Sequence, residues 1–348
     1  MNKILFILKR REDYNATLHS AVGLSTGLYN SASFMNDMLN DMGIPSNLVV
    51  VTDNNDIDRE VTKYKPTHVI IEALWVVPQK FVVLQKLHPN VIWIVRYHSE
   101  LPFLAGEGMA MDWTADYLSY PNVYLGVNAP RMMDELRLYA TCKYGEKAVD
   151  KIIYMPNYYP QDYKPCNKMD KNSPYINIGC FGAVRPLKNH MNQALAAIKF
   201  AESIGKKLRF HINSGRLEMK GEPVMHNLRA TFMQLGEKGH ELINHTWTPR
   251  EQFLETCAEM DIGMQVSFSE TFNIVGADLI SQGVPLVGSS EIPWISCMFS
   301  ASATETGDIY NALRKTYNSP KLNIWTNQFN LKSYTNKTKK IWYNLFKD

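Results

Sequence analysis

Acidic residues at a helix start offer the clearest candidate chemistry in this sequence. Glu270 lies just before a predicted helix, and Asp278 follows eight residues later, about two helical turns in. The free N–H groups at residues 273–275 of such a helix can bind an anion. A carboxylate before them can accept hydrogen bonds from sugar hydroxyls, and one two turns further on can reach a ribose. The alternative is that Glu270 only caps the helix and Asp278 is a solvated residue.

A second candidate group contains two cations. Arg185 and Lys188 lie in the segment Gly179–Asn189, directly after a predicted strand. Arginine binds phosphate with a planar fork and lysine acts as a point charge, so the pair suits a departing diphosphate. Lys188 also precedes a predicted helix, where a cation is unfavourable unless an anion lies nearby. The alternative is a solvated loop.

A third candidate group follows another strand. His98, Ser99 and Glu100 come just after the predicted strand Val91–Val95, and the segment continues to Glu107. Ligands of open α/β sheets bind at the carboxyl ends of strands, so this segment is predicted to border a ligand site. The alternative for His98 is an imidazole satisfied by local backbone.

These groups need a scaffold of alternating strands and helices. Short β-branched runs separated by amphipathic segments indicate buried parallel strands in βαβ units, so the fold class is α/β. The predicted strands of the first half are Ile4–Leu8, Leu48–Thr52, His68–Ile71, Val91–Val95, Val123–Val127 and Ile152–Met155. Those of the second half are Ile176–Phe181, Leu208–Ile212, Leu242–His245, Ile262–Val266 and Pro285–Val287. The predicted helices include Asp56–Tyr64, Phe272–Ser281 and Trp325–Phe346.

A break separates the halves. Residues 156–174 contain four prolines and no periodic pattern, which is typical of a linker. We therefore predict two Rossmann-like domains facing one cleft, residues 1–157 and 175–322. Residues 158–174 form the linker, and a further helix is predicted within 323–348.

Composition excludes several classes of protein. The 348 residues can bury two cores, and the net charge of +3 does not by itself indicate nucleic-acid binding. The run Lys332–Lys340, with aromatic neighbours, is predicted to be a solvated helix face. Five scattered cysteines without CxxC spacing, and no run of about 20 apolar residues, predict a cytoplasmic protein with reduced thiols and no integral membrane contact.

The sequence contains one possible metal-binding motif, and it has another explanation. Asp56-Ile-Asp58 is a literal Asp-x-Asp, but it stands at a predicted helix start, where capping explains it. HExxH, Cys–His clusters and P-loops are absent from the sequence. We predict no metal and no cofactor beyond the donor substrate.

The first segment resembles the signature of retaining GT-B glycosyltransferases, particularly the large family-four group. Glu270, Phe272, Asp278, Gly283, Pro285 and Val287 match that signature in type and spacing. Asn273 replaces a usual Gly and Asp278 replaces a usual Glu. The resemblance implies that Glu270 contacts the donor sugar.

Other segments extend the resemblance. Arg185 and Lys188 match the residues that bind the diphosphate, although they stand three positions apart instead of five. His98 resembles a cleft histidine that approaches the transferred sugar, and Tyr154–Asn157 resembles the Pro-Asn that ends domain one. The turn Gly23–Gly27 resembles a Gly-rich loop near the donor phosphates, and Trp247–Pro249 lies where the family's chain runs beside the base. The resemblance thus implies donor contacts from Gly27, Gly182, Arg185, Lys188, Trp247, Glu270, Phe272, Asn273, Ile274, Val275 and Asp278.

The implied activity is metal-independent transfer of a sugar from a nucleotide diphosphate, UDP favoured, to an acceptor hydroxyl with retention. The resemblance implies that Glu270, His98, Arg185 and Lys188 are catalytic. It also implies that residues 1–157, with His98, Ser99 and Glu100, lie on the acceptor side, that residues 175–322 bind the nucleotide sugar, and that the last helix returns to domain one. A glycan, a lipid-linked sugar and a hydroxylated base of duplex DNA all remain open as acceptors. A sugar-nucleotide epimerase and a catalytically silent nucleotide-sugar-binding protein are the alternatives, and the sequence leaves the oligomeric state undetermined.

Overall fold

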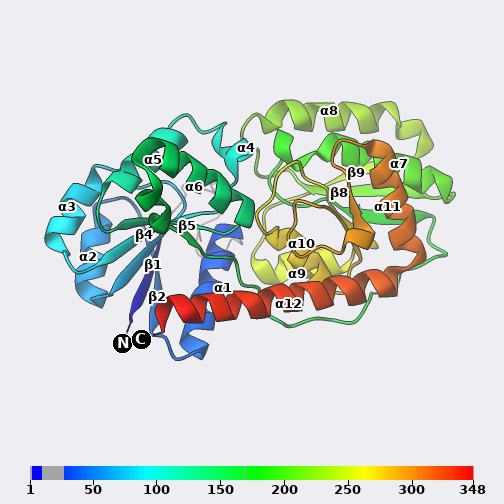
Figure 1. Ribbon diagram of the computed structural model, residues 1–348. Coiled ribbons are helices and arrows are strands. Elements are labelled where there is room, and N and C mark those ends of the chain that lie inside the picture. The colour runs from blue at the N-terminus through cyan, green and yellow to red at the C-terminus, as the bar shows by residue number, and fades with distance from the viewer. Residues whose placement is uncertain (1, 10–26, 168, 348) are drawn as a thin grey trace. The chain divides into compact units, whose positions relative to one another are not determined.

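A computed structural model describes residues 2–9, 27–167 and 169–347. The chain forms two compact units. Of the described residues, the first contains 2–9, 27–160 and 335–347, and the second contains 161–167 and 169–334. In the described part of the chain, each unit contains a six-stranded parallel sheet flanked by helices (Figure 1).

The first sheet has the strand order β2-β1-β3-β4-β5-β6, and every pairing is parallel. Parallel neighbours need crossovers, which the helices supply. Its strands are β1 (Ile4–Lys9), β2 (Ser46–Val51), β3 (His68–Glu72), β4 (Ile92–Tyr97), β5 (Val123–Val127) and β6 (Ile152–Tyr154). The helices are α1 (Gly27–Asp41), α2 (Asp56–Tyr64), α3 (Lys80–Leu87), α4 (Leu101–Leu104), α5 (Ala110–Ser119) and α6 (Pro130–Tyr144).

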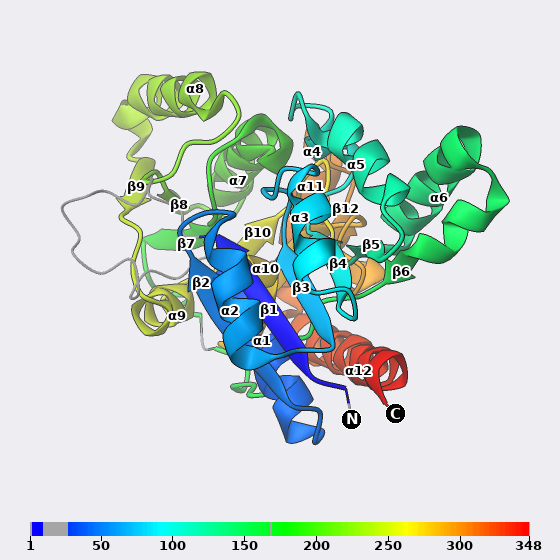
Figure 2. The ribbon, with the colours of Figure 1, turned by 90° about the vertical axis from the view of Figure 1, so that its left-hand side faces the viewer.

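Both faces of this sheet are buried, and the side chains of its central strands alternate between them. Leu5 and Ile7 of β1 belong to the core formed with α2, α3, α5 and α6. Figure 2 shows α2 lying along the sheet beside β1. Ile4 and Phe6 point to the opposite face, where α1 and the end of α12 (Pro320–Phe346) pack. Successive strand residues face opposite sides, so a continuous apolar run such as β1 is what a doubly covered strand requires.

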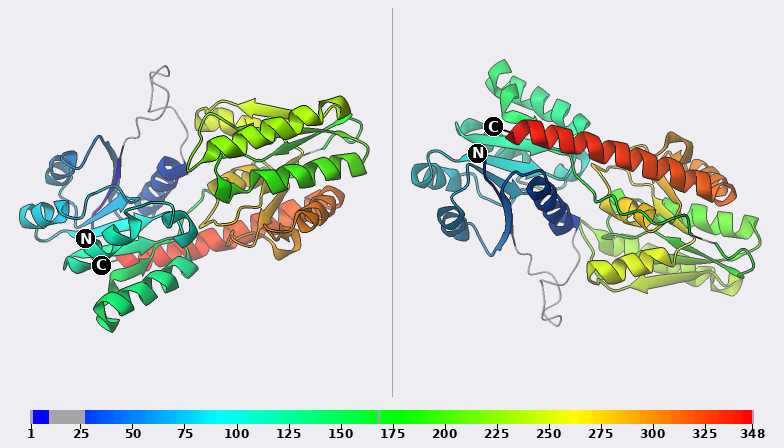
Figure 3. Two further views of the ribbon diagram at one scale, coloured as in Figure 1. Left: turned by 90° about the horizontal axis from the view of Figure 1, so that it is seen from above. Right: turned by 90° about the horizontal axis from the view of Figure 1, so that it is seen from below.

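Helix α12 contributes to both units. Its residues up to Tyr334 belong to the second unit and those from Thr335 to the first. It is continuous through this change (Figure 3). In the first unit the Trp342 indole is fully buried, donates to the Pro156 carbonyl at 2.9 Å and packs on Phe6.

The second sheet has the order β12-β11-β10-β7-β8-β9. Its strands are β7 (Tyr175–Gly179), β8 (Lys207–Asn213), β9 (Glu241–His245), β10 (Ile262–Gln265), β11 (Leu286–Ser289) and β12 (Ser300–Ala301). Its helices, besides the first part of α12, are α7 (His190–Ser203), α8 (Gly221–Gln234), α9 (Arg250–Ala258), α10 (Ile274–Ser281) and α11 (Thr306–Asn318). One core joins β7, β8 and β10 to α7, α8 and α11.

The α/β class and the parallel strands agree with the prediction; the differences lie at element ends and in short elements such as α4 and β12, which were not predicted. The sequence predicts a helix that begins at Phe272, but the corresponding helix, α10, begins at Ile274 because Asn273 has a left-handed backbone, φ 62°. The last helix begins at Pro320, five residues before the predicted Trp325. The predicted acceptor loop contains the short helix α4, with proline in its first turn.

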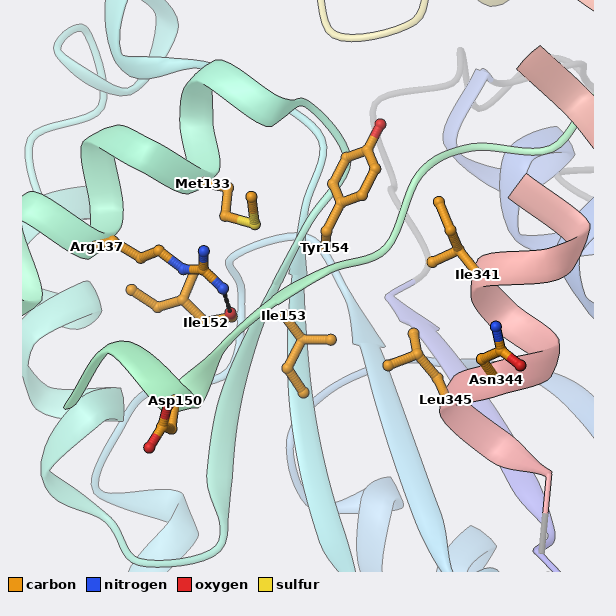
Figure 4. Close-up of a pocket in the computed structure, with 9 residues that line it drawn as sticks. All are labelled: Met133, Arg137, Asp150, Ile152, Ile153, Tyr154, Ile341, Asn344 and Leu345. Carbon is orange, nitrogen blue, oxygen red and sulfur yellow. Dashed lines mark hydrogen bonds between the residues drawn. The ribbon is translucent and has the colours of Figure 1, made fainter. Parts of the chain in front are cut away.

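A shallow pocket of about 490 Å³ lies in the first unit beside the edge strand β6 (Figure 4). Arg137 of α6 closes one side by donating to the Ile152 carbonyl at 3.3 Å. The pocket is lined by Met133, Arg137, Asp150, Ile152, Ile153, Tyr154, Ile341, Asn344 and Leu345. None of the predicted site residues lines it.

Candidate functional site

The loop after β7 is held in place by two residues with unusual backbone. Gly182 has φ 110°, a conformation that favours glycine, and its amide donates to Asn213 Oδ1 at 3.1 Å. Asn189 has φ 57°, and its side-chain amide donates to the carbonyls of Val266 at 3.0 Å and Ala303 at 2.7 Å. Asparagine tolerates this left-handed region better than most residues. The segment carrying Arg185 and Lys188 is therefore fixed at both ends.

Lys188 and Glu270 meet in the second unit. The Lys188 ammonium forms an ion pair with Glu270 Oε1, and both side chains are largely buried. The two loops follow β7 and β10, which are neighbours in the sheet, so their carboxyl ends meet at one edge. The two residues that the sequence singled out for diphosphate and sugar thus lie in direct contact.

Arg185 has a carboxylate partner that the sequence did not suggest. Its Nη1 lies 2.9 Å from Glu218 Oε2, and Glu218 also pairs with Arg216. The Arg216 guanidinium in turn lies 5.7 Å from the Trp247 ring centroid, within cation–π range. Trp247 therefore borders the same charged group as Arg185.

The start of α10 is organised by the side chain of Asn273. Asn273 Oδ1 accepts from the Gly276 amide at 2.7 Å, and Asn273 Nδ2 donates to Gln265 Oε1 at 2.9 Å. The side chain thus caps one amide and ties the turn to β10. The amides of Ile274 and Val275 donate to none of the described residues, so they can bind a ligand.

The other end of the signature segment is explained by packing. Gly283 has φ 78°, and a Cβ there would meet the Pro165 carbonyl oxygen at 1.9 Å, so only glycine fits. Phe272 is buried, and its ring lies 5.5 Å from that of Tyr334. Gly283 and Phe272 thus support the backbone around α10.

Asp278 is engaged by a residue that the sequence analysis missed. Arg250 Nη1, at the start of α9, lies 2.8 Å from Asp278 Oδ1, and Asp278 is buried. The signal that could have found Arg250 is its position directly after Trp247–Pro249, the segment already expected to run beside the base.

His98, in the first unit, contacts the buried carboxylate of Glu72 through Nε2. Burial lowers the pKa of the His98 imidazole, and the Arg96 guanidinium lowers it further, while Glu72 acts in the opposite sense. The imidazole is thus neutral near neutral pH. The other two predicted acceptor residues differ: Ser99 is partly exposed, whereas Glu100 is buried and pairs with Arg131 of α6.

The remaining predictions concern the phosphate loop, metals and membranes. Gly27 is the first residue of α1, and Gly23 to Thr26 lie outside the described residues. The capping expected of Asp-x-Asp is wrong, because the N-cap residue of α2 is Asn55 and no described side chain caps the helix; instead Asp56 accepts from the Thr52 amide at 2.9 Å and Asp58 pairs with His88. Over residues 2–9, 27–167 and 169–347, no three His, Cys, Asp or Glu side chains gather as a metal site would require. In the same residues, no helix is long and apolar enough to cross a membrane.

Comparison with solved structures places the fold. The chain is similar to a sucrose-phosphate synthase from Thermosynechococcus elongatus, with a TM-score of 0.68 at 13% identity over 99% of this chain and 98% of that one. A UDP-forming trehalose-phosphate synthase from Burkholderia vietnamiensis gives 0.70 at 10% identity over 99% and 96%. Anabaena HepE, solved with UDP and glucose, gives 0.65 at 12% identity over 99% and 98%.

These similarities span both units and confirm the predicted GT-B resemblance: the protein has the two-domain, Rossmann-like GT-B fold. No sequence-family profile matches the chain. No curated protein sequence matches it either. The likeness therefore lies in the fold, at identities of 10–13% in these three comparisons.

Proposed function

We propose that the protein transfers a sugar from a nucleotide diphosphate, UDP in the first instance, to an acceptor hydroxyl with retention and without a metal. The observation that carries this proposal is the contact between Lys188 and Glu270 beside the free amides of α10. A cation, a carboxylate and two N–H groups at one edge of a parallel sheet suit the diphosphate and the sugar of one donor. The similarity to UDP-forming and UDP-bound GT-B proteins supports UDP.

In the proposed reaction, the bond between the anomeric carbon and the donor phosphate oxygen breaks, and the acceptor oxygen forms the new bond. Negative charge develops on the departing diphosphate. Arg185, Lys188 and the amides of Ile274 and Val275 stabilise that charge, which is the largest kind of contribution in such sites. The acceptor's proton passes to a donor phosphate oxygen.

The other donor contacts are proposed from the family resemblance. Glu270 binds hydroxyls of the sugar, Asp278 faces the ribose beside Arg250, and Trp247 lies beside the base. Gly182 lets the backbone approach the phosphates, and Phe272 and Asn273 shape the turn that carries Glu270. We assign Gly27 of the first unit to the donor phosphates, and His98, Ser99 and Glu100 to the acceptor side.

The test is a thermal-shift series with UDP, GDP, ADP and CDP, each with and without EDTA. A ligand at 100 times its dissociation constant adds about 2.7 kcal/mol, which moves the midpoint by several degrees. We expect UDP to give the largest shift, unchanged by EDTA and lost in Lys188→Met. Lys238→Met is the matched control, because Lys238 forms an exposed pair with Glu202 in the same unit and its loss should leave the shift intact.

The acceptor is proposed to be a glycan or a hydroxylated base of duplex DNA. The basic run Lys332–Lys340 supports the DNA alternative. A gel shift with duplex DNA that weakens steeply with salt would favour it, whereas the absence of a shift at low salt would direct the search to glycans. A protein that shows no thermal shift with any of the four nucleotides would contradict the donor assignment.

A further inference from the structure

A fully buried ion pair underlies His98. Glu72 ends β3 and Arg96 lies on β4, and the two are direct neighbours in the strand register. Both side chains are 0% exposed, and Arg96 Nη1 lies 3.1 Å and 3.3 Å from the two Glu72 oxygens. Burying two charges is costly unless geometry and further hydrogen bonds compensate, so such a pair requires an explanation.

Further contacts hold the Arg96 guanidinium in place. Its Nε donates to the Met155 carbonyl at 3.2 Å, and its Nη2 donates to Asn157 Oδ1. Asn157 Oδ1 also accepts from the Ser31 hydroxyl at 2.9 Å, and the Trp342 ring lies 5.2 Å from the guanidinium carbon. The guanidinium therefore cannot rotate, and it holds the Glu72 carboxylate in one orientation.

The carboxylate in turn determines the state of the imidazole. Glu72 accepts from His98 Nε2, which places the ring proton of neutral His98 on Nε2. Burial alone would raise the pKa of Glu72, but Arg96 and His98 outweigh it and the pKa is lowered. Glu72 thus stays ionised and remains an acceptor throughout the neutral range.

We propose that Glu72 and Arg96 are positioning residues: they fix the ring orientation and the tautomer with which His98 meets the transferred sugar. The proposal rests on the proposed function, in which His98 lies on the acceptor side and approaches the sugar. Neither Glu72 nor Arg96 reaches the surface, so their effect passes through His98. Small misplacements of a reacting group can cost about a hundredfold in rate, which is enough to justify a buried ion pair.

The first test is kinetic, with hydrolysis of UDP-glucose as the assay. Glu72→Gln keeps the shape but removes the charge, and we expect kcat to fall at least tenfold while KM changes less than twofold. Asp58→Asn is the matched control, because Asp58 also pairs with a histidine, His88, in the same unit at 2.7 Å. Its kcat should equal that of the wild type.

The second test reads the imidazole directly and does not depend on turnover. In 15N-histidine spectra, with the His98 signal assigned from His98→Gln, the wild type should show one tautomer, protonated on Nε2. Glu72→Gln should show a mixture of tautomers. The double variant Glu72→Gln/Arg96→Gln, which leaves no unpaired buried charge, should also show the mixture and serves if the single variant does not fold.

The outcomes separate the two proposals. A kcat that falls in His98→Gln but not in Glu72→Gln, or a tautomer unchanged in both Glu72 variants, would overturn the positioning role and leave the proposed function standing. A kcat unaffected in His98→Gln would overturn the role of His98 in the proposed function and, with it, the positioning role.

Discussion

Glu218 should compete with the donor for Arg185. In the structure Glu218 pairs with both Arg185 and Arg216, so a diphosphate that binds Arg185 must displace this carboxylate. Glu218→Gln removes the competing charge and preserves the shape of the side chain. We therefore expect the variant to bind UDP more tightly than the wild type.

The size of the expected gain in UDP affinity follows from how exposed the Arg185–Glu218 ion pair is. The Arg185 and Glu218 side chains are 21% and 19% exposed, so their pair lies between a surface pair and a buried one. Surface pairs contribute up to about 1 kcal/mol, and we take that upper value. Since about 1.4 kcal/mol is a factor of ten, releasing the pair should lower the UDP dissociation constant about fivefold.

Isothermal titration with UDP measures this directly. Glu241→Gln is the control, because Glu241 forms a comparable pair with Arg209 at 3.0 Å on neighbouring strands of the same sheet, away from the phosphate loop. Its affinity should match the wild type. Equal or weaker UDP binding by Glu218→Gln would refute the reasoning and show that Glu218 holds Arg185 ready for the phosphate instead of competing with it.

Three further outcomes are expected. Asn273→Ala should destabilise the second unit by about 3 kcal/mol, since it loses a cap, strains a left-handed backbone and removes the donor to Gln265 Oε1. In thermal melts, Asn273→Gly should destabilise the unit by about 1 kcal/mol less than Asn273→Ala. Arg185→Ala should lower turnover about 10²–10³-fold in the UDP-glucose assay, and a normal rate would exclude the assigned role. Burial lowers the pKa of His211 to about 4, and the nearby charges of His245 and Arg209 lower it as well. On acidification the unfolded chain therefore binds a proton before the folded chain does, and the free energy of unfolding measured in urea melts should fall between about pH 6.5 and pH 4. His211→Gln should reduce this loss.

The sequence predicted much of the fold because strand periodicity is local. The predicted helix Asp56–Tyr64 matches α2 in full, and the predicted strand Val123–Val127 matches β5. The start of α10 was missed by two residues because a cap depends on one backbone angle, and the helix pattern alone does not report it. Asn273, which replaces the family's usual glycine, marks the true start of α10, since it stands in the left-handed region where glycine is favoured.

The partners of the site could not be predicted in the same way. Lys188 and Glu270 could be brought together from topology, because each follows a strand and those strands are neighbours. Glu72 and Arg96 pair only because β3 and β4 have a particular register, and a shift of one residue would separate them. Glu218 and Arg250 lie on a loop and at a helix start, where no periodicity identifies a partner.

The helix α12 sets an order of assembly during synthesis. The first unit holds residues from both ends of the described chain: β1 is made early, but its core stays open until residues 335–346 supply Trp342 and Phe346. The second unit, ending at Tyr334, has all its residues before then. In the linear order of the chain the second unit is therefore complete before the first, whose core with Phe6 and Met35 lacks Trp342 and Phe346 until the last turns of α12 have been added.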